Sequence, residues 1–220
     1  MSEDAPSRPA VDSTRVLRLA PRAPGRRLFV YLHGYGARAE NLHGVAEDLA
    51  AAFPDSESLL PDGFEPTATG AGRHWWSVAD MTDENRARRI AAATDAFEPW
   101  LDRELEARSL GSSDVTLVGF SQGAALAVSL GTRRELDGVV SFCGRPTDPR
   151  GTSVRTRMLL VQGTQDPFIS AADATRFEAA LRSQGAHVEL RLLEGLGHGI
   201  NREAVDLARR FMAASPRASP

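Results

Sequence analysis

The sequence of 220 residues contains no lysine, and all 26 of its basic residues are arginine. A catalytic lysine is therefore excluded from any mechanism. The chain has no strong basic excess either, because its 29 acidic residues leave a formal net charge of −3. Proteins that neutralise nucleic-acid phosphates need such an excess, so we expect no nucleic-acid partner.

Cysteine and long apolar runs are also scarce. Cys143 is the single cysteine, so no internal disulfide can form and the fold needs no oxidising compartment. No stretch approaches the roughly 18 apolar residues that span a bilayer. Residues 1–15 contain early acids and prolines but no apolar segment of a signal peptide. We expect a cytoplasmic protein without stable membrane insertion.

Strand-like and helix-like segments alternate along most of the chain. We expect mobile tails at residues 1–13 and 214–220, which are rich in Pro, Ser, Ala and charge, around one domain at 14–213. The pattern predicts strands over 16–19, 27–33, 57–61, 114–120, 138–143, 158–163 and 187–193. It predicts helices over 40–52, 83–108, 122–132, 171–184 and 201–213, the second of them kinked or split at Pro99. This alternation predicts an α/β fold with a mostly parallel central sheet and helices on both faces.

A candidate nucleophile lies between a predicted strand and a predicted helix. The segment Gly119-Phe120-Ser121-Gln122-Gly123 has the G-x-S-x-G pattern, with VTLV before it and AALAVSL after it. Such a strand-to-helix turn holds the serine in a strained conformation with its hydroxyl exposed, and small flanking residues let the two backbones approach. The free N–H of Gln122 at the helix start can face a developing oxyanion.

Serine is a poor nucleophile without a base, and His198 is the best placed of the five histidines. It follows the last predicted strand, at the sheet edge that also carries the turn with Ser121, and glycines flank it. The remaining histidines are His33, which follows a strand, His43 on a helix, His74 in an irregular segment and His187 in a strand pattern.

The acid of such a triad is expected between the serine and the histidine in the chain. Asp166 follows the strand at 158–163 directly and is our candidate for the group that accepts His198 Nδ1–H. Asp137 precedes a strand and therefore lies at the wrong edge. Asp148 lies in a proline-rich loop, and Asp173 fits the first turn of a helix.

Four segments together are similar to one known family. LHGYG at 32–36, GFSQGAALA at 119–127, GTQDP at 163–167 and GLGHGI at 195–200 resemble, in order and spacing, the phospholipase/carboxylesterase family, which includes the acyl-protein thioesterases. The resemblance spans roughly residues 27–212 and implies an α/β-hydrolase fold. It also implies that Tyr35 N–H joins Gln122 N–H in the oxyanion hole, and that the aromatic motif at 73–76 lines an acyl pocket.

The pocket residues are open to two interpretations. Trp75 and Trp76 lie in the irregular segment 61–82, which leaves the carboxyl edge of its strand, where ligands of open α/β sheets bind. We therefore expect at least one of these rings to line the acyl pocket, although core packing fits each ring equally well. Phe168 can likewise be pocket wall or core. Cys143 is expected to be a buried, inert thiol.

The sequence thus predicts a serine carboxylesterase that hydrolyses small-molecule esters through an acyl-serine intermediate, without a metal or cofactor. Acyl-thioesterase, lysophospholipase and perhydrolase-like activities on the same triad are alternatives. A fold relative that binds a ligand without catalysis is an alternative of another class.

Overall fold

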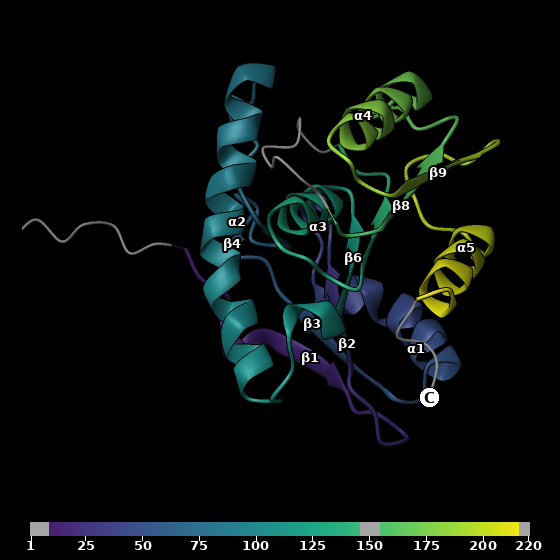
Figure 1. The fold of residues 1–220 in the computed structure, drawn as a ribbon. Coiled ribbons are helices and arrows are strands. Elements are labelled where there is room, and N and C mark those ends of the chain that lie inside the picture. The colour runs from purple at the N-terminus through teal and green to yellow at the C-terminus, as the bar shows by residue number, and fades with distance from the viewer. Residues whose placement is uncertain (1–8, 146–154, 216–220) are drawn as a thin grey trace, which may run out of the picture.

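The fold is organised by one mostly parallel sheet. The computed structural model describes residues 9–145 and 155–215, and seven of its strands form a sheet in the order β1-β3-β2-β6-β7-β8-β9 (Figure 1). Only β1 is antiparallel to its neighbour in this sheet. The strands are β1 (Val16–Leu19), β2 (Arg27–Leu32), β3 (Ser56–Pro61), β6 (Val115–Phe120), β7 (Gly138–Phe142), β8 (Met158–Gly163) and β9 (Val188–Leu193). The seven predicted strands are confirmed.

The central strands are buried on both faces. In β2, alternate side chains enter different core clusters: Leu28 and Val30 face one, while Phe29 and Tyr31 face the other. Helices must therefore cover both faces of the sheet, which explains why these strands read as continuous apolar runs.

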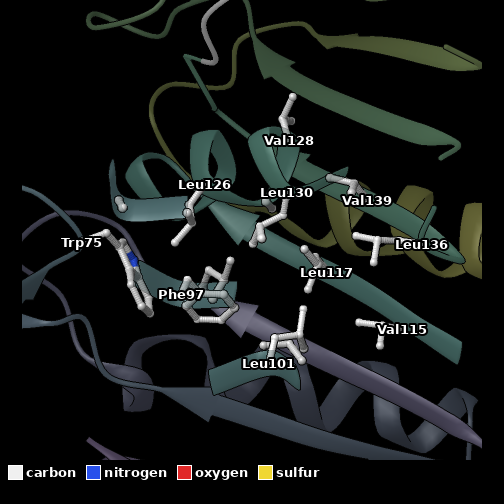
Figure 2. Close-up of a cluster of buried hydrophobic side chains, with 14 of the residues drawn as sticks. Trp75, Phe97, Leu101, Val115, Leu117, Leu126, Val128, Leu130, Leu136 and Val139 are labelled. Atoms are coloured by element: carbon white, nitrogen blue, oxygen red, sulfur yellow. The ribbon is translucent and has the colours of Figure 1, made fainter. Parts of the chain in front are cut away.

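The helices supply those two covering layers (Figure 1). They are α1 (His43–Ala52), α2 (Asp83–Glu106), α3 (Gln122–Arg133), α4 (Ala171–Ser183) and α5 (Arg202–Ala213). Buried residues of α2, α3 and α4 belong to one cluster, part of which Figure 2 shows, and those of α1 and α5 belong to the other. The α/β-hydrolase arrangement predicted from the sequence is confirmed. In the described ranges no helix combines the length and the apolar character needed to cross a bilayer.

Two helix predictions need correction. The first turn of the helix predicted at 40–52 is a short 3-10 helix, η2 (Ala39–Leu42), which leads into α1. Of the kink or split predicted at Pro99, the split is wrong, because the long helix α2 continues over all 24 residues. Pro99 offers no N–H to the carbonyl of Asp95, yet both residues are exposed, so water can replace the missing donor.

Both ends of the described chain pack on the domain rather than leaving it. Val11 is 5% exposed and belongs to the core cluster of α2, while Ser215 is 6% exposed. The packed unit therefore extends beyond 14–213 at each end. The rest of the expected tails, residues 1–8 and 216–220, lies outside the described residues.

The strand order changes direction at the centre of the sheet. After β2 the chain forms β3 on the side of β2 that faces β1. It then crosses back and forms β6 on the opposite side of β2. Leu32 at the end of β2 pairs with Gly119 near the end of β6. The loops that leave these two strands therefore start side by side and run in opposite directions. Ligands of open α/β sheets bind in the crevice between two such loops.

Candidate active site

Ser121 occupies a strained turn between β6 and α3. Its backbone has φ 53° and ψ −111°, in a region that residues with a side chain rarely adopt. The N–H of Ser121 donates to the carbonyl of Phe142 at 2.9 Å, which fixes the turn to the end of β7. The geometry is that expected of a nucleophile elbow.

The two glycines of the elbow motif are required by close backbone approach. A methyl group on Gly119 would lie 2.5 Å from Cα of Ala124, and one on Gly123 would lie 2.0 Å from the carbonyl oxygen of Leu32. Neither backbone could give way without moving α3 off the sheet. The spacing of the motif is therefore a packing constraint as well as a chemical one.

His198 and Asp166 meet Ser121 at the carboxyl edge of the sheet. His198 Nε2 lies 3.0 Å from Ser121 Oγ, and His198 Nδ1 lies 2.7 Å from Asp166 Oδ2. The Asp166 side chain is fully buried and that of His198 is 17% exposed. A hydroxyl, an imidazole and a carboxylate thus form a continuous hydrogen-bonded chain that can carry a proton from the serine to the histidine.

The Asp166 carboxylate accepts four hydrogen bonds, two at each oxygen. Its Oδ1 accepts the backbone N–H groups of Phe168 at 2.8 Å and Ile169 at 3.1 Å, while Oδ2 accepts Gln162 Nε2 at 2.8 Å as well as His198. Burial alone would raise the pKa of Asp166, but the hydrogen bonds from His198, Phe168, Gln162 and Ile169 outweigh it and lower that pKa. The carboxylate therefore stays ionised, and its orientation is fixed.

The other acidic candidates lie elsewhere. Asp137 precedes β7 and accepts a hydrogen bond from Thr116 Oγ1, at the opposite edge of the sheet. Asp173 caps α4, where its carboxylate accepts the Ser170 hydroxyl. Asp148 lies outside the described residues.

The two backbone N–H groups expected in the oxyanion hole, those of Tyr35 and Gln122, have no acceptor in the part of the chain that is described. Gln122 is the first residue of α3. Gly34, which precedes Tyr35, lies against the elbow, since a methyl group there would approach Ser121 Cβ to 3.3 Å. Two free donors therefore belong to segments that meet at the serine, as anion stabilisation requires.

A cavity of about 550 Å³ opens beside this chain of groups. Apart from Ser121, Gln122 and His198, its lining is Tyr35, Trp76, Val78, Met81, Arg86, Ala125, Arg145, Phe168 and Ile169. Most of these side chains are apolar, which suits an acyl chain or another hydrophobic group. Phe168 is 71% exposed at the cavity and its ring packs edge-on against His198, with the centroids 5.0 Å apart. The structure thus brings Trp76 and Phe168 to the cavity.

Trp75 does not line this cavity, so the expectation that it forms part of the pocket is corrected. The ring is 2% exposed and packs against Phe64 and against Phe97, the second of which Figure 2 shows beside it. Its Nε1–H donates to the carbonyl of His33 at 2.8 Å. The two tryptophans lie in a bend that follows Arg73–His74, and there Trp75 enters the core while Trp76 faces the cavity.

The side chain of Gln122 has a role that sequence reasoning missed. Its Oε1 accepts the backbone N–H of Trp75 and its Nε2 donates to the carbonyl of Trp76, both at 2.8 Å. A primary amide can bond a backbone donor and acceptor at once, which is the only signal the sequence offers. These bonds fasten the pocket loop to the elbow.

One group of potential metal ligands lies in the described ranges: Cys143, Asp166 and His198. Burial raises the pKa of the Cys143 thiol to about 11, so it is protonated at neutral pH and is a poor ligand. Asp166 and His198 already satisfy one another. This donor set is better suited to proton transfer than to holding a metal ion.

Comparison with known proteins shows which family this chain is similar to. Residues 18–215 match the profile of a family described as Phospholipase/Carboxylesterase. The chain is 32% identical over 192 residues to Esterase YpfH of Escherichia coli (strain K12), an alignment that covers 86% of this chain and 83% of the relative. It is 27% identical over 230 residues to Acyl-protein thioesterase 1 of Eremothecium gossypii, covering 93% and 95%. The crystal structure of esterase PE8 superimposes with a TM-score of 0.82 at 24% identity, covering 89% and 96%, and so shares the fold.

Proposed function

The chain belongs to the phospholipase/carboxylesterase family, and from this premise we propose that it is a serine esterase that hydrolyses carboxylic esters through an acyl-Ser121 intermediate. The single observation that carries the proposal is the hydrogen-bonded chain from Ser121 through His198 to Asp166 beside an apolar cavity. Each group has the neighbour that its role needs.

The first half of the reaction forms the acyl-enzyme. Ser121 Oγ attacks the acyl carbonyl of the ester while its proton moves to His198 Nε2. The N–H groups of Tyr35 and Gln122 bind the oxygen that becomes negative, and Asp166 stabilises the imidazolium. The tetrahedral intermediate then collapses, and His198 gives its proton to the departing alcohol.

The second half repeats these steps with water. His198 Nε2 removes a proton from a water molecule, which attacks the acyl carbonyl of the ester formed on Ser121. Collapse of the second tetrahedral intermediate releases the carboxylic acid and returns the proton to Ser121. The reaction consumes one water for each ester and needs no group beyond this chain's own residues.

A fluorophosphonate probe tests the nucleophile independently of substrate choice. The probe should label the native protein, and peptide mapping should place the label on Ser121. Ser121→Ala should lose the label and at least about 10³-fold of the turnover of a p-nitrophenyl ester, because the triad acts as a unit. Ser183→Ala is a matched control, since Ser183 is exposed on α4 and its hydroxyl donates to the carbonyl of Ala180. Absence of labelling and of turnover would favour a non-catalytic binding protein.

Thioester hydrolysis is a second candidate, supported by the similarity to an acyl-protein thioesterase. The same oxyanion hole and triad serve either leaving group, so the cavity and not the triad must decide. A short ester, a long-chain acyl-CoA and a lysophospholipid, assayed side by side, separate the candidates by their kcat/KM values.

We also propose a cytoplasmic location, which the buried, reduced Cys143 supports.

A further inference from the structure

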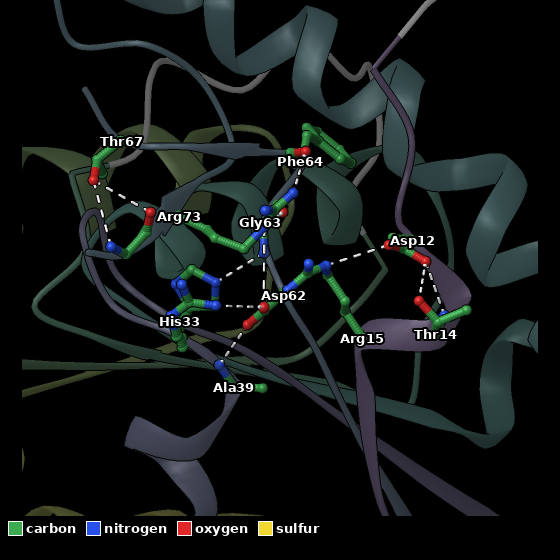
Figure 3. Close-up of polar contacts among 12 residues, drawn as sticks. Asp12, Thr14, Arg15, His33, Ala39, Asp62, Gly63, Phe64, Thr67 and Arg73 are labelled. Atoms are coloured by element: carbon green, nitrogen blue, oxygen red, sulfur yellow. Dashed lines mark hydrogen bonds and ion pairs between the residues drawn. The ribbon is translucent and has the colours of Figure 1, made fainter. Parts of the chain in front are cut away.

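His33 lies directly behind the expected oxyanion hole but outside the triad. It follows β2 and is 1% exposed, among Asp62, Gly63 and Arg73 (Figure 3). Both ring nitrogens have backbone partners: His33 Nδ1 is 2.7 Å from the carbonyl oxygen of Gly34, and His33 Nε2 is 2.8 Å from the N–H of Gly63. A buried, fully satisfied histidine beside a reaction centre must be explained, because a hydrophobic residue would fill the same space.

The partners fix the protonation state of the ring. A carbonyl oxygen can only accept, so Nδ1 carries a hydrogen, and an N–H can only donate, so Nε2 carries none. His33 is therefore the neutral Nδ1–H tautomer. Burial agrees with this, because it lowers the pKa of His33 despite the hydrogen bond to Gly34 and the nearby Asp62 and Glu40 carboxylates, and Arg73 lowers it further.

The carbonyl that His33 holds belongs to the peptide unit that carries the Tyr35 N–H. In a planar trans peptide the C=O and N–H bonds point in opposite directions, so holding the Gly34 oxygen also aims the Tyr35 hydrogen. That hydrogen is one of the two free donors beside Ser121. We propose that His33 is a positioning residue of the oxyanion hole, whose Nδ1–H orients the Gly34–Tyr35 peptide toward the reacting carbonyl. This inference rests on the proposed function.

Two further contacts show how the unit is braced. The N–H of Ala37 also donates to the Gly34 carbonyl, at 3.2 Å, which closes a turn but at a longer distance than the His33 contact. The indole N–H of Trp75 holds the carbonyl of His33 itself. The histidine is thus fixed at its backbone and at both ring nitrogens, so its Nδ1–H can set the direction of one specific peptide group.

Two substitutions separate the nitrogens of the ring. His33→Asn keeps an amide donor near the position of Nδ1 but loses the acceptor for Gly63. His33→Gln places its amide near the position of Nε2, so its oxygen can accept Gly63 N–H, and it loses the donor to Gly34. Each variant gives up one buried hydrogen bond, so both should lose comparable thermal stability. Only His33→Gln removes the 2.7 Å contact to the Gly34 carbonyl and leaves the Gly34–Tyr35 peptide with the longer Ala37 bond alone.

We expect His33→Gln to reduce kcat for a p-nitrophenyl ester by about 10- to 100-fold with KM changed less than about threefold, because a misdirected oxyanion donor weakens only transition-state binding. His33→Asn should stay within about threefold of the wild type. A trifluoromethyl ketone, whose Ser121 adduct carries an oxyanion, should bind His33→Gln more weakly by the same factor as the loss in kcat/KM. If the glutamine variant does not fold, His33→Leu provides a second variant without the donor.

The outcomes distinguish this inference from the function on which it rests. A wild-type protein that neither reacts with the fluorophosphonate probe nor hydrolyses any ester overturns the proposed function. An active wild type together with equal losses in His33→Asn and His33→Gln overturns only the positioning role, because the loss would then follow stability. Unchanged kcat in a folded His33→Gln overturns it as well.

Discussion

Replacing Asp166 by asparagine tests how the triad is held, because the surroundings allow only one orientation of the new amide. Asp166 Oδ1 accepts two backbone N–H groups, from Phe168 and Ile169, so the oxygen of an asparagine must remain there. Its NH₂ group then takes the place of Oδ2, opposite Gln162 and His198. The opposite orientation would set a donor against two backbone donors and lose two hydrogen bonds, each worth about 1 kcal/mol.

The NH₂ group reverses the role of His198. Gln162 cannot turn its own amide to accept, because its Nε2 also donates to the carbonyl of Ile169 at 3.0 Å. His198 Nδ1 can accept from the new amide only if its proton has moved to Nε2. The imidazole then presents a donor to Ser121 Oγ, so it cannot take the serine's proton. The variant folds with the wrong tautomer.

We expect kcat of Asp166→Asn to fall by about 10⁴-fold, the scale of this change in serine–histidine–aspartate triads, which is about 5.4 kcal/mol of transition-state stabilisation. The thermal midpoint should also fall, because Gln162 loses a charged acceptor. The assay is kcat and KM with a p-nitrophenyl ester, with circular dichroism as the check of folding. Asp173→Asn is the matched control, since Asp173 caps α4 and its carboxylate accepts from Ser170 and Arg176 and not from His198. A folded Asp166→Asn that keeps more than a tenth of wild-type kcat would refute this reasoning.

The remaining predictions concern the pocket and the core. Trp76→Ala should lose kcat/KM progressively from p-nitrophenyl acetate to octanoate, because each buried methylene is worth about 0.8 kcal/mol; an equal loss for both esters would contradict a role in reading the chain. Trp75→Ala should instead lower the free energy of unfolding by about 3–5 kcal/mol in urea titrations, as expected of a core aromatic ring. The wild type should lose at most about 3 kcal/mol of stability between about pH 9 and 11, because burial raises the pKa of the Cys143 thiol to about 11 in the folded state, whereas the unfolded thiol ionises near 9. Cys143→Ala should not show this loss, and parallel curves of stability against pH for the two proteins would be the contrary result.

Much of this molecule follows from local pattern. Strand residues such as Leu28 to Leu32 form a continuous apolar run, and a run of that length between turn residues is a strand buried on both faces. The sequence points to Ser121 because its turn demands glycines at fixed spacing, and to Asp166 and His198 because each lies in the loop that follows a strand of the same sheet. These inferences needed only chain order and the rule that parallel strands end at one edge.

Other features depended on contacts between distant segments. Core and pocket fit Trp75 and Trp76 equally well in the sequence, and only the packing of Trp75 against Phe64 and Phe97 distinguishes the two rings. Continuity of α2 through Pro99 depended on exposure, which a helical pattern alone does not specify.

His33 illustrates the division most clearly. The sequence by itself determined that a histidine and a glycine follow β2, and that this loop leaves the sheet beside the elbow. Only the tertiary structure brought Gly63 to one side of the ring and the Gly34 carbonyl to the other. The physical reason is that a hydrogen bond depends on distances of about 3 Å between atoms, whereas a sequence specifies periodicity and chain order but not which backbone groups from distant segments meet.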